Sequence, residues 1–221
     1  MPNDIRTKAI VLRRTNYGET DRILNLLTPE GKYSVLAKGV RKEKSRLAGG
    51  IEMFCVSEIT IHEGRSNLAT LTSAKMLTFF QNLLTDFTRL ELASQLLKQI
   101  NKASDQVDSP DFFDILSQSL SALNSTHDPR LVEAWFLLNL AKTSGSPANL
   151  HFDTTGNKLT EDKTYAWDTI EFSLAPADQG NITANHIKLM RLLTVADLTV
   201  ATRVKNYNDF LDDILYIAKS I

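Results

Sequence analysis

Short runs in which hydrophobic and polar residues alternate fill the first third of the chain. In the fourth run, Ile59 and Ile61 are predicted to face inward, and Glu58, Thr60 and His62 to face outward. A period of two residues is typical of half-buried β-strands. The pattern therefore predicts strands at Lys8–Arg14, Arg22–Leu27, Tyr33–Val40, Phe54–His62 and Leu68–Ala74.

Turn-forming residues separate these runs. The segment from Thr28 to Gly31 places proline second and glycine fourth, as in a type I turn that closes a hairpin. A second hairpin loop is expected at residues 63–67. Five short strands are too few for a β-sandwich but fit a small closed barrel of the OB-fold type. Residues 1–78 are therefore predicted to form an OB-fold domain.

After Met76 the hydrophobic period lengthens to about 3.6 residues, which is the period of an amphipathic helix. Thr88 has the capping-box spacing to Glu91, and Ser109 and Asp128 each precede a proline at a predicted first helical position. The positions predicted to form the helical core are Phe87, Leu90, Ala93, Leu97, Ile100, Phe112, Leu116, Leu120, Leu123, Leu131, Trp135 and Leu138.

Two further helices are predicted, at about Thr183–Leu193 and at Asn208–Ser220. Between Gly145 and Asn181 the helical period is lost, and aromatic and apolar residues indicate an irregular β-hairpin. The predicted fold class is α+β. An all-α helical domain over residues 79–221 follows the barrel and carries a cysteine-free insertion at about residues 145–181. The residues that indicate the hairpin are Tyr165, Trp167, Ile170 and Phe172.

Composition places the chain among ordinary globular proteins, with 43% hydrophobic and 23% charged residues. The first residues alternate charged and apolar side chains, and no apolar run approaches the roughly 18 residues of a membrane span, so neither a signal peptide nor a span is expected. The single cysteine, Cys55, excludes an internal disulfide, which fits a reducing compartment. A cytoplasmic location is expected.

The formal net charge of −1 hides an uneven distribution. Residues 1–75 hold 13 lysines and arginines against 8 acids, whereas the rest of the chain holds 12 against 18. Within residues 32–46 there are six basic side chains and one acid, Glu43. Most of these follow the third strand and are predicted to lie on a loop that contacts phosphates without reading base sequence. The alternative is a solvated loop that only keeps the barrel soluble.

The sequence gives only weak indications of base stacking, catalysis or metal binding. Tyr17 and Tyr33 could stack on bases or belong to the barrel core. His151 and Asp153 form a lone His-x-Asp pair, and no P-loop, dinucleotide-binding glycine motif or nucleophile elbow is present. We expect no catalytic residue, no cofactor and no metal. Two alternatives remain: an interaction scaffold that binds mainly protein, and a metal-dependent nuclease that uses His151 and nearby acids.

Residues 8–61 combine a first strand, a Tyr-Gly-Glu element followed by Asp21, the TPEGK turn and the basic segment AKGVRKEKSRL. This combination and its spacing resemble the start of the RecO family of DNA repair proteins, which are recombination mediators. Residues 65–77 continue the resemblance, and the helical remainder agrees through the order of its helices.

The resemblance implies a non-enzymatic role in recombinational repair. It implies binding of single- and double-stranded DNA, strand annealing, and loading of the RecA recombinase together with RecR. The DNA would be coated by single-stranded-DNA-binding protein, whose acidic tail the helical domain contacts, although no motif here indicates that groove. The resemblance implies DNA contact by Lys38, Arg41, Lys42, Lys44 and Arg46, with Arg13, Arg14 and Arg22 as lesser candidates.

Many members of the family carry a four-cysteine zinc module after the third long helix. In this chain the corresponding residues 147–181 hold no cysteine, and His151 is their only histidine. A tetrahedral zinc site needs four such ligands, so we expect a variant without the zinc module. Side chains such as Tyr165, Trp167 and Phe172 are expected to hold the hairpin instead.

Overall fold

The computed structural model describes residues 3–63, 68–201 and 203–221. The chain forms two compact units, Met1–Asn124 and Ser125–Ile221. The hairpin loop predicted at residues 63–67 lies almost wholly outside the described residues. Within the described part, no helix is long and apolar enough to cross a membrane.

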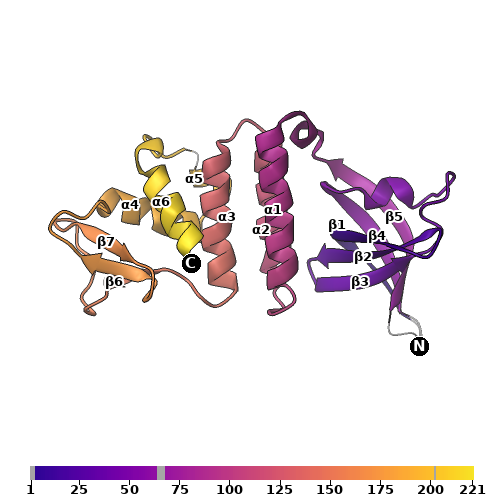
Figure 1. Ribbon diagram of the computed structural model, residues 1–221, viewed down its shortest axis with the longest axis horizontal. Coiled ribbons are helices and arrows are strands. Elements are labelled where there is room, and N and C mark those ends of the chain that lie inside the picture. Colours follow the sequence, from indigo (N-terminus) through magenta and orange to yellow (C-terminus); the bar gives the residue numbers. More distant parts are fainter. Residues whose placement is uncertain (1–2, 64–67, 202) are drawn as a thin grey trace. The chain divides into compact units, whose positions relative to one another are not determined.

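In the first unit, strands close into a barrel in the order β1-β2-β3-β5-β4 (Figure 1). Neighbouring strands are antiparallel except β3 and β5, which run parallel. This arrangement is that of an OB-fold and confirms the predicted barrel. The strands are β1 (Asn3–Tyr17), β2 (Asp21–Thr28), β3 (Gly31–Ala37), β4 (Cys55–Glu63) and β5 (Ala69–Phe79).

The barrel core follows the predicted alternation. Ile59 and Ile61 are buried in it, while Glu58, Thr60 and His62 are partly exposed. The predicted turn between β2 and β3 is also confirmed: the Thr28 hydroxyl donates to the Gly31 carbonyl at 2.9 Å and accepts from the Glu30 N–H at 3.1 Å. The strand pattern thus identified both the inner face and the first hairpin correctly.

The first unit is completed by helices. A 3-10 turn η1 (Ala48–Ile51) lies between β3 and β4, and η2 (Gln81–Thr85) precedes α1 (Phe87–Ala103) and α2 (Asp111–Leu123). Leu97, Ile100, Phe112, Leu116 and Leu120 are buried as predicted.

The predicted start of α1 is wrong. Asp86, not Thr88, caps the helix, and its side chain accepts from the Arg89 N–H at 3.1 Å. A cap needs extended backbone before the first helical residue, and Asp86 has it, whereas Thr88 already lies inside the helix. Phe87 at the first helical position is 78% exposed and does not join the core.

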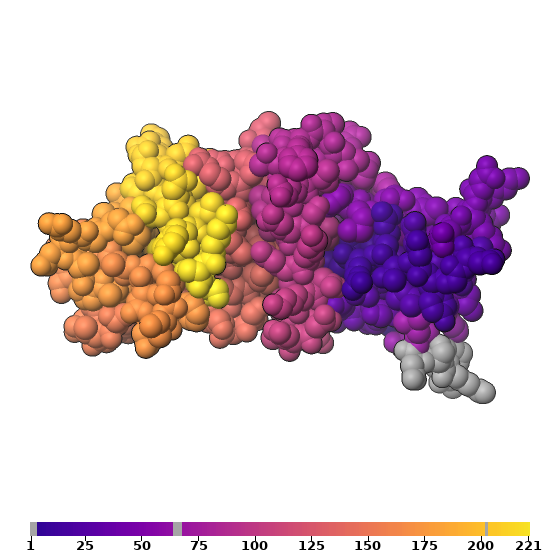
Figure 2. All heavy atoms as spheres, viewed as in Figure 1, coloured from indigo at the N-terminus to yellow at the C-terminus, as the bar shows by residue number. Residues whose placement is uncertain are grey.

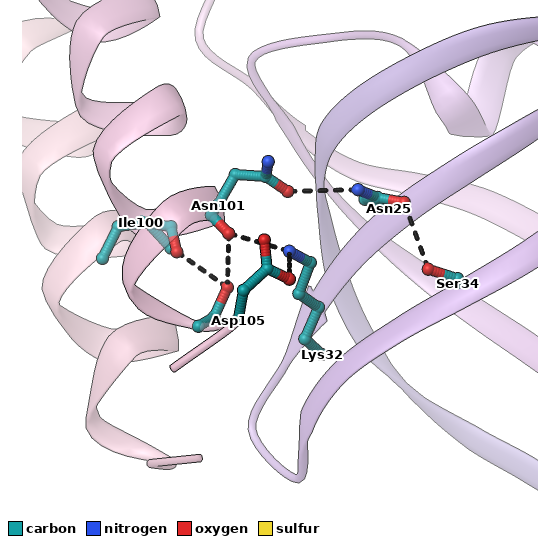
Figure 3. Close-up of polar contacts among 7 residues, drawn as sticks. Asn25, Lys32, Ser34, Ile100, Asn101 and Asp105 are labelled. Carbon is teal, nitrogen blue, oxygen red and sulfur yellow. Dashed lines mark hydrogen bonds and ion pairs between the residues drawn. The ribbon is translucent and has the colours of Figure 1, made fainter. Parts of the chain in front are cut away.

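Polar contacts join α1 to the barrel (Figure 3). The Asn25 side chain of β2 donates to the Asn101 side-chain oxygen at 3.2 Å. The ammonium of Lys32 on β3 donates to the Asn101 carbonyl at 2.8 Å and pairs with the Asp105 carboxylate at 2.6 Å. These contacts, together with packing of α1 on β1, explain why the first unit extends to Asn124. The strands give way to helices near residue 80, and the division into domains at residue 78 stays a prediction.

The second unit combines helices with a small sheet. Its helices are α3 (Pro129–Thr143), α4 (Ala184–Val195), α5 (Leu198–Ala201) and α6 (Asn208–Ser220). Asp128 caps α3 through the Arg130 N–H, as predicted. The sheet has the order β6-β8-β7, with β6 (Asn149–Asp153), β7 (Tyr165–Asp168) and β8 (Ser173–Pro176). The predicted hairpin is β7 with β8, to which β6 adds a parallel strand.

Tyr165 holds this sheet together. It is fully buried, its backbone exchanges two hydrogen bonds with Ile182, and its hydroxyl accepts from the Thr160 N–H at 2.9 Å. The Trp167 indole donates to the Ser220 hydroxyl at 2.7 Å and so ties β7 to the end of α6. Ile170 is 85% exposed and takes no part in the packing.

Candidate nucleic-acid interface

Five of the predicted cations share one loop. Residues 38–47 connect β3 to η1 and project from the barrel (Figure 2). The basic loop is defined here as residues 38–46. Its cationic side chains are all exposed: Lys38, Arg41, Lys42, Lys44 and Arg46.

The start of the basic loop is fixed to the barrel. Val40 is only 4% exposed and belongs to the barrel core. Gly39 has a φ of +63°, a left-handed conformation that glycine adopts without strain. Its N–H donates to the Asp21 carboxylate at 2.7 Å, and the Arg41 N–H donates to the Thr20 carbonyl at 2.9 Å. The backbone is therefore anchored on both sides of Val40 while the charged side chains point to solvent.

The Asp21 carboxylate is adapted to this role. The hydrogen bond from the Gly39 N–H, followed by one from the Thr20 hydroxyl, lowers the pKa of Asp21 below its ordinary value. The positive charges of Lys38 and Lys42 act in the same direction. Each of these contacts favours the ionised carboxylate.

An exposed tyrosine lies next to the basic loop. The Arg41 guanidinium donates to the carbonyl of Gly18, in the turn between β1 and β2, at 3.2 Å. Tyr17, directly before that glycine, is 55% exposed. Tyr33, by contrast, packs against the barrel core, and burial raises its pKa. Of the two tyrosines considered for base stacking, Tyr17 is exposed and Tyr33 is packed against the core.

The three lesser candidates differ in position. Arg22 lies opposite Ala37, the residue before the basic loop, and its Nε donates to the Asn16 side chain at 3.2 Å. Arg14 pairs with Glu52 at 2.8 Å. Arg13 is exposed and pairs across strands with Asn25, which faces α1. The structure thus brings Arg22 beside the basic loop and places Arg13 and Arg14 elsewhere on β1.

Lys32 counted toward the basic cluster in the sequence, but it has another role. Its side chain is 11% exposed and is bound by α1. Sequence reasoning also missed Asp21 as the anchor of the basic loop and Lys98 of α1 as a neighbour of Arg13. The aspartate is local and could have been noticed, whereas Lys98 is brought near by the fold alone.

The second unit contains an apolar hollow of about 740 Å³ between α3, β6 and α4. Basic side chains border it, and their present partners are backbone carbonyls or an exposed acid. Arg191 donates to the Leu150 carbonyl, Lys142 donates to the Thr194 carbonyl, and Lys188 pairs with Glu161. The apolar lining includes Leu138, Pro147, Leu150, Leu192 and Val195.

The residues considered for catalysis do not come together as a site in the part of the chain that the structure describes. His151 is exposed, and the described ranges contain no group of three or more His, Cys, Asp or Glu side chains that could hold a metal ion. Cys55 is buried in the barrel, and burial raises the pKa of its thiol, which favours the unreactive protonated form.

Two family models match this chain, one over the barrel and one over the helical part. Residues 1–80 match the family model "Recombination protein O N terminal", and residues 84–220 match "Recombination protein O C terminal". The chain is 28% identical over 221 residues to a DNA repair protein RecO of Dehalococcoides mccartyi strain 195, covering 96% of this chain and 87% of that protein.

Two further relatives match over shorter segments. A DNA repair protein RecO of D. mccartyi strain CBDB1 is 35% identical over 65% of this chain and 57% of its own length. One of Heliobacterium modesticaldum is 38% identical over 63% of this chain and 51% of its own length. With both family models matched across an OB-fold barrel and its helices, the chain belongs to the RecO family of DNA repair proteins.

Proposed function

We propose that this chain is a DNA-binding recombination mediator that acts without making or breaking covalent bonds. It binds single- and double-stranded DNA, promotes annealing of complementary strands, and cooperates with RecR to load RecA onto coated DNA in the cytoplasm. The observation that carries the proposal is the anchored basic loop with its five exposed cations. The family membership supports the same role.

Annealing is limited by repulsion between two phosphate backbones. Each lysine or arginine of the basic loop can neutralise one phosphate and release a counterion, which is favourable without any base readout. Arg22 extends this surface along β2, and Tyr17 offers a ring on which a base can stack. The surface therefore screens phosphates while leaving the pairing edges of the bases free.

The apolar hollow of the second unit is our proposed docking site for the acidic tail of single-stranded-DNA-binding protein. Its apolar floor suits the hydrophobic side chains of a peptide, and Lys142, Lys188 and Arg191 supply charge complementary to the acids. The Lys188–Glu161 ion pair is well exposed on both sides, so it is weak and can be exchanged for a peptide carboxylate.

The test of the basic loop is DNA affinity measured across salt concentrations. A variant with Arg41→Ala, Lys42→Ala and Lys44→Ala should bind single-stranded DNA more weakly. The slope of log affinity against log salt concentration should become shallower by roughly 2, because each of three lost phosphate contacts contributes about 0.7 to that slope. Strand annealing, with and without the coating protein, should slow in the same variant.

A matched control removes the same number of positive charges, two lysines and one arginine, from the second unit. Lys158, Arg203 and Lys205 are exposed there, and their replacement by alanine should leave the salt slope unchanged. If the loop variant and the control variant bind DNA alike, the loop has no role in DNA contact. If the wild-type chain binds DNA no better than a neutral protein does, the scaffold that binds mainly protein becomes the better description.

The tail site has an independent test. A fluorescent peptide with the sequence of the tail should bind the wild-type chain, and Arg191→Ala with Lys188→Ala should weaken that binding. The triple variant of the basic loop should bind the peptide normally. If the variant with both replacements binds the peptide as tightly as the wild-type chain does, the tail binds elsewhere.

A further inference from the structure

A second basic feature of the first unit lies between β1 and α1. It is a cleft of about 470 Å³, and its lining comes from β1, the segment before β4, and α1. Three of its lining side chains are cationic, and two are apolar. The lining residues are Leu12, Arg13, Arg14, Met53, Lys98 and Asn101.

A β-bulge places Arg13 at this cleft. Val11 pairs with Leu26 and Arg13 with Asn25, so Leu12 is an extra residue in β1. In a strand without the bulge, strict alternation through Leu12 would put Arg13 on the same face as Val11, in the barrel core. The bulge instead puts Arg13 on the face of its partner Asn25, whose side chain reaches α1.

Lys98 reaches the same place from α1. It is exposed and lies three residues before Asn101, so the two side chains share one face of the helix. Asn101 is tied to the barrel through Asn25, and Lys32 holds the following turn (Figure 3). The helix that carries Lys98 is therefore fixed against the strand that carries Arg13.

The three cations that line the cleft differ in whether an acid neutralises them. Arg14 pairs with Glu52 at 2.8 Å. Among the residues that the structure describes, neither the Arg13 nor the Lys98 side chain makes a hydrogen bond or an ion pair. Leu12 and Met53 supply an apolar lining beside these free charges. Two cations whose side chains have no partner, beside an apolar lining, suit a phosphate and its attached sugar.

We propose that this cleft binds the phosphate backbone of a DNA strand and extends the DNA-binding surface from the barrel onto α1. Arg13 lies four residues along β1 from Tyr17, a span of about 13 Å at the rise of a β-strand. A strand that contacts the basic loop can therefore continue into the cleft. The proposal rests on the proposed function and adds Lys98, a residue of the helical part, to the DNA contacts.

The test uses the full chain with Lys98→Ala and Lys98→Glu. Both replacements are at an exposed helical position, so the fold should persist. The alanine variant should lower the salt slope for long single strands by about 0.7, the contribution of one phosphate. The glutamate variant should bind more weakly still, and the length of strand that one molecule occludes should shorten in both.

The matched control is Lys75→Ala, an exposed lysine of the first unit on β5, away from the cleft. It should leave slope and occluded length unchanged. If both Lys98 variants behave like this control while the triple variant of the basic loop loses affinity, the cleft is overturned and the proposed function stands. If the Lys98 variants lose affinity and the loop variant does not, the cleft is supported and the loop is removed from the DNA path.

Discussion

The Asp21 carboxylate, at the first residue of β2, accepts a 2.7 Å hydrogen bond from the N–H of Gly39, the second residue of the basic loop. This bond carries the contact between the two segments one step beyond the last β2–β3 strand pair, Arg22 with Ala37, to the start of the basic loop. It lets a loop of repelling cations keep one backbone path at its start.

Replacing Asp21 with alanine should free the start of the basic loop. The Gly39 amide then loses its acceptor, so its hydrogen exchange should accelerate, while amides in β1 and β4 keep their protection. An unchanged exchange rate at Gly39 would contradict the anchoring role. Glu19→Ala, which removes an exposed acid from the neighbouring turn, is the control.

The lowered pKa of Asp21 predicts that the anchoring of the basic loop depends on pH. Because its folded pKa is lowered, first by the Gly39 N–H and then by the Thr20 hydroxyl, its stabilising effect is complete above the unfolded value of about 3.9. That effect is lost as the pH falls through the lower, folded pKa. The amide chemical shift of Gly39 should therefore titrate below the ordinary aspartate range and should not titrate in an Asp21→Asn variant.

Lys32→Met should destabilise the first unit without weakening DNA binding. The change removes the ammonium that binds the Asn101 carbonyl and Asp105, so the free energy of unfolding should fall by roughly 1–3 kcal/mol. Lys8→Met, at an exposed position on β1, should have little effect on stability. Weaker DNA binding by a folded Lys32 variant would show that Lys32 contacts DNA after all.

Gly31→Ala should destabilise the hairpin between β2 and β3. Gly31 has a φ of +127°, and an added Cβ would lie 2.7 Å from a carboxylate oxygen of Asp108. We expect a cost of roughly 1–3 kcal/mol, most of it from backbone strain, so removing the Asp108 side chain should restore little. Gly49→Ala is a matched control, because that glycine has open space around its Cβ position. Equal unfolding midpoints for the two variants would contradict the strain.

Tyr165→Phe should destabilise the second unit by roughly 1–2 kcal/mol, because the Thr160 N–H loses its acceptor in a part-buried site. Tyr216→Phe, on an exposed tyrosine of α6, is the control and should be nearly neutral.

A chelator should leave the unfolding temperature of the wild-type chain unchanged, because hydrogen bonds and packing hold the sheet of the second unit. A large drop on chelation would mean that a metal contributes to its stability.

Local signals account for the parts of the fold that the sequence predicted. The turn from Thr28 to Gly31 and the cap of α3 at Asp128 depend on neighbouring residues, and both are confirmed. The misplaced cap of α1 shows the limit, since Asp86 and Thr88 are both good capping residues and only the backbone path distinguishes them.

Contacts between distant residues explain what the sequence did not predict. Lys32 looked like one more cation of the basic cluster, but in the fold it pairs with Asp105 in the turn after α1. The parallel strand β6 and the short helix α5 have too few residues for a periodic signal. The five exposed cations of the basic loop were identified from charge, but their anchoring and the convergence of Arg13 with Lys98 required the fold.

The parallel seam between β3 and β5 also bears on how the chain folds as it is synthesised. In the part that the structure describes, the two strands meet through Val35 with Ala69 and Leu36 with Thr70, partners far apart in the sequence. The β2–β3 hairpin can form early, but the free edge of β3 stays unpaired until β5 leaves the ribosome. An unpaired edge invites pairing with another chain, and flanking lysines and arginines oppose such pairing. The charges that follow β3 are therefore expected to protect the nascent barrel from aggregation before it closes.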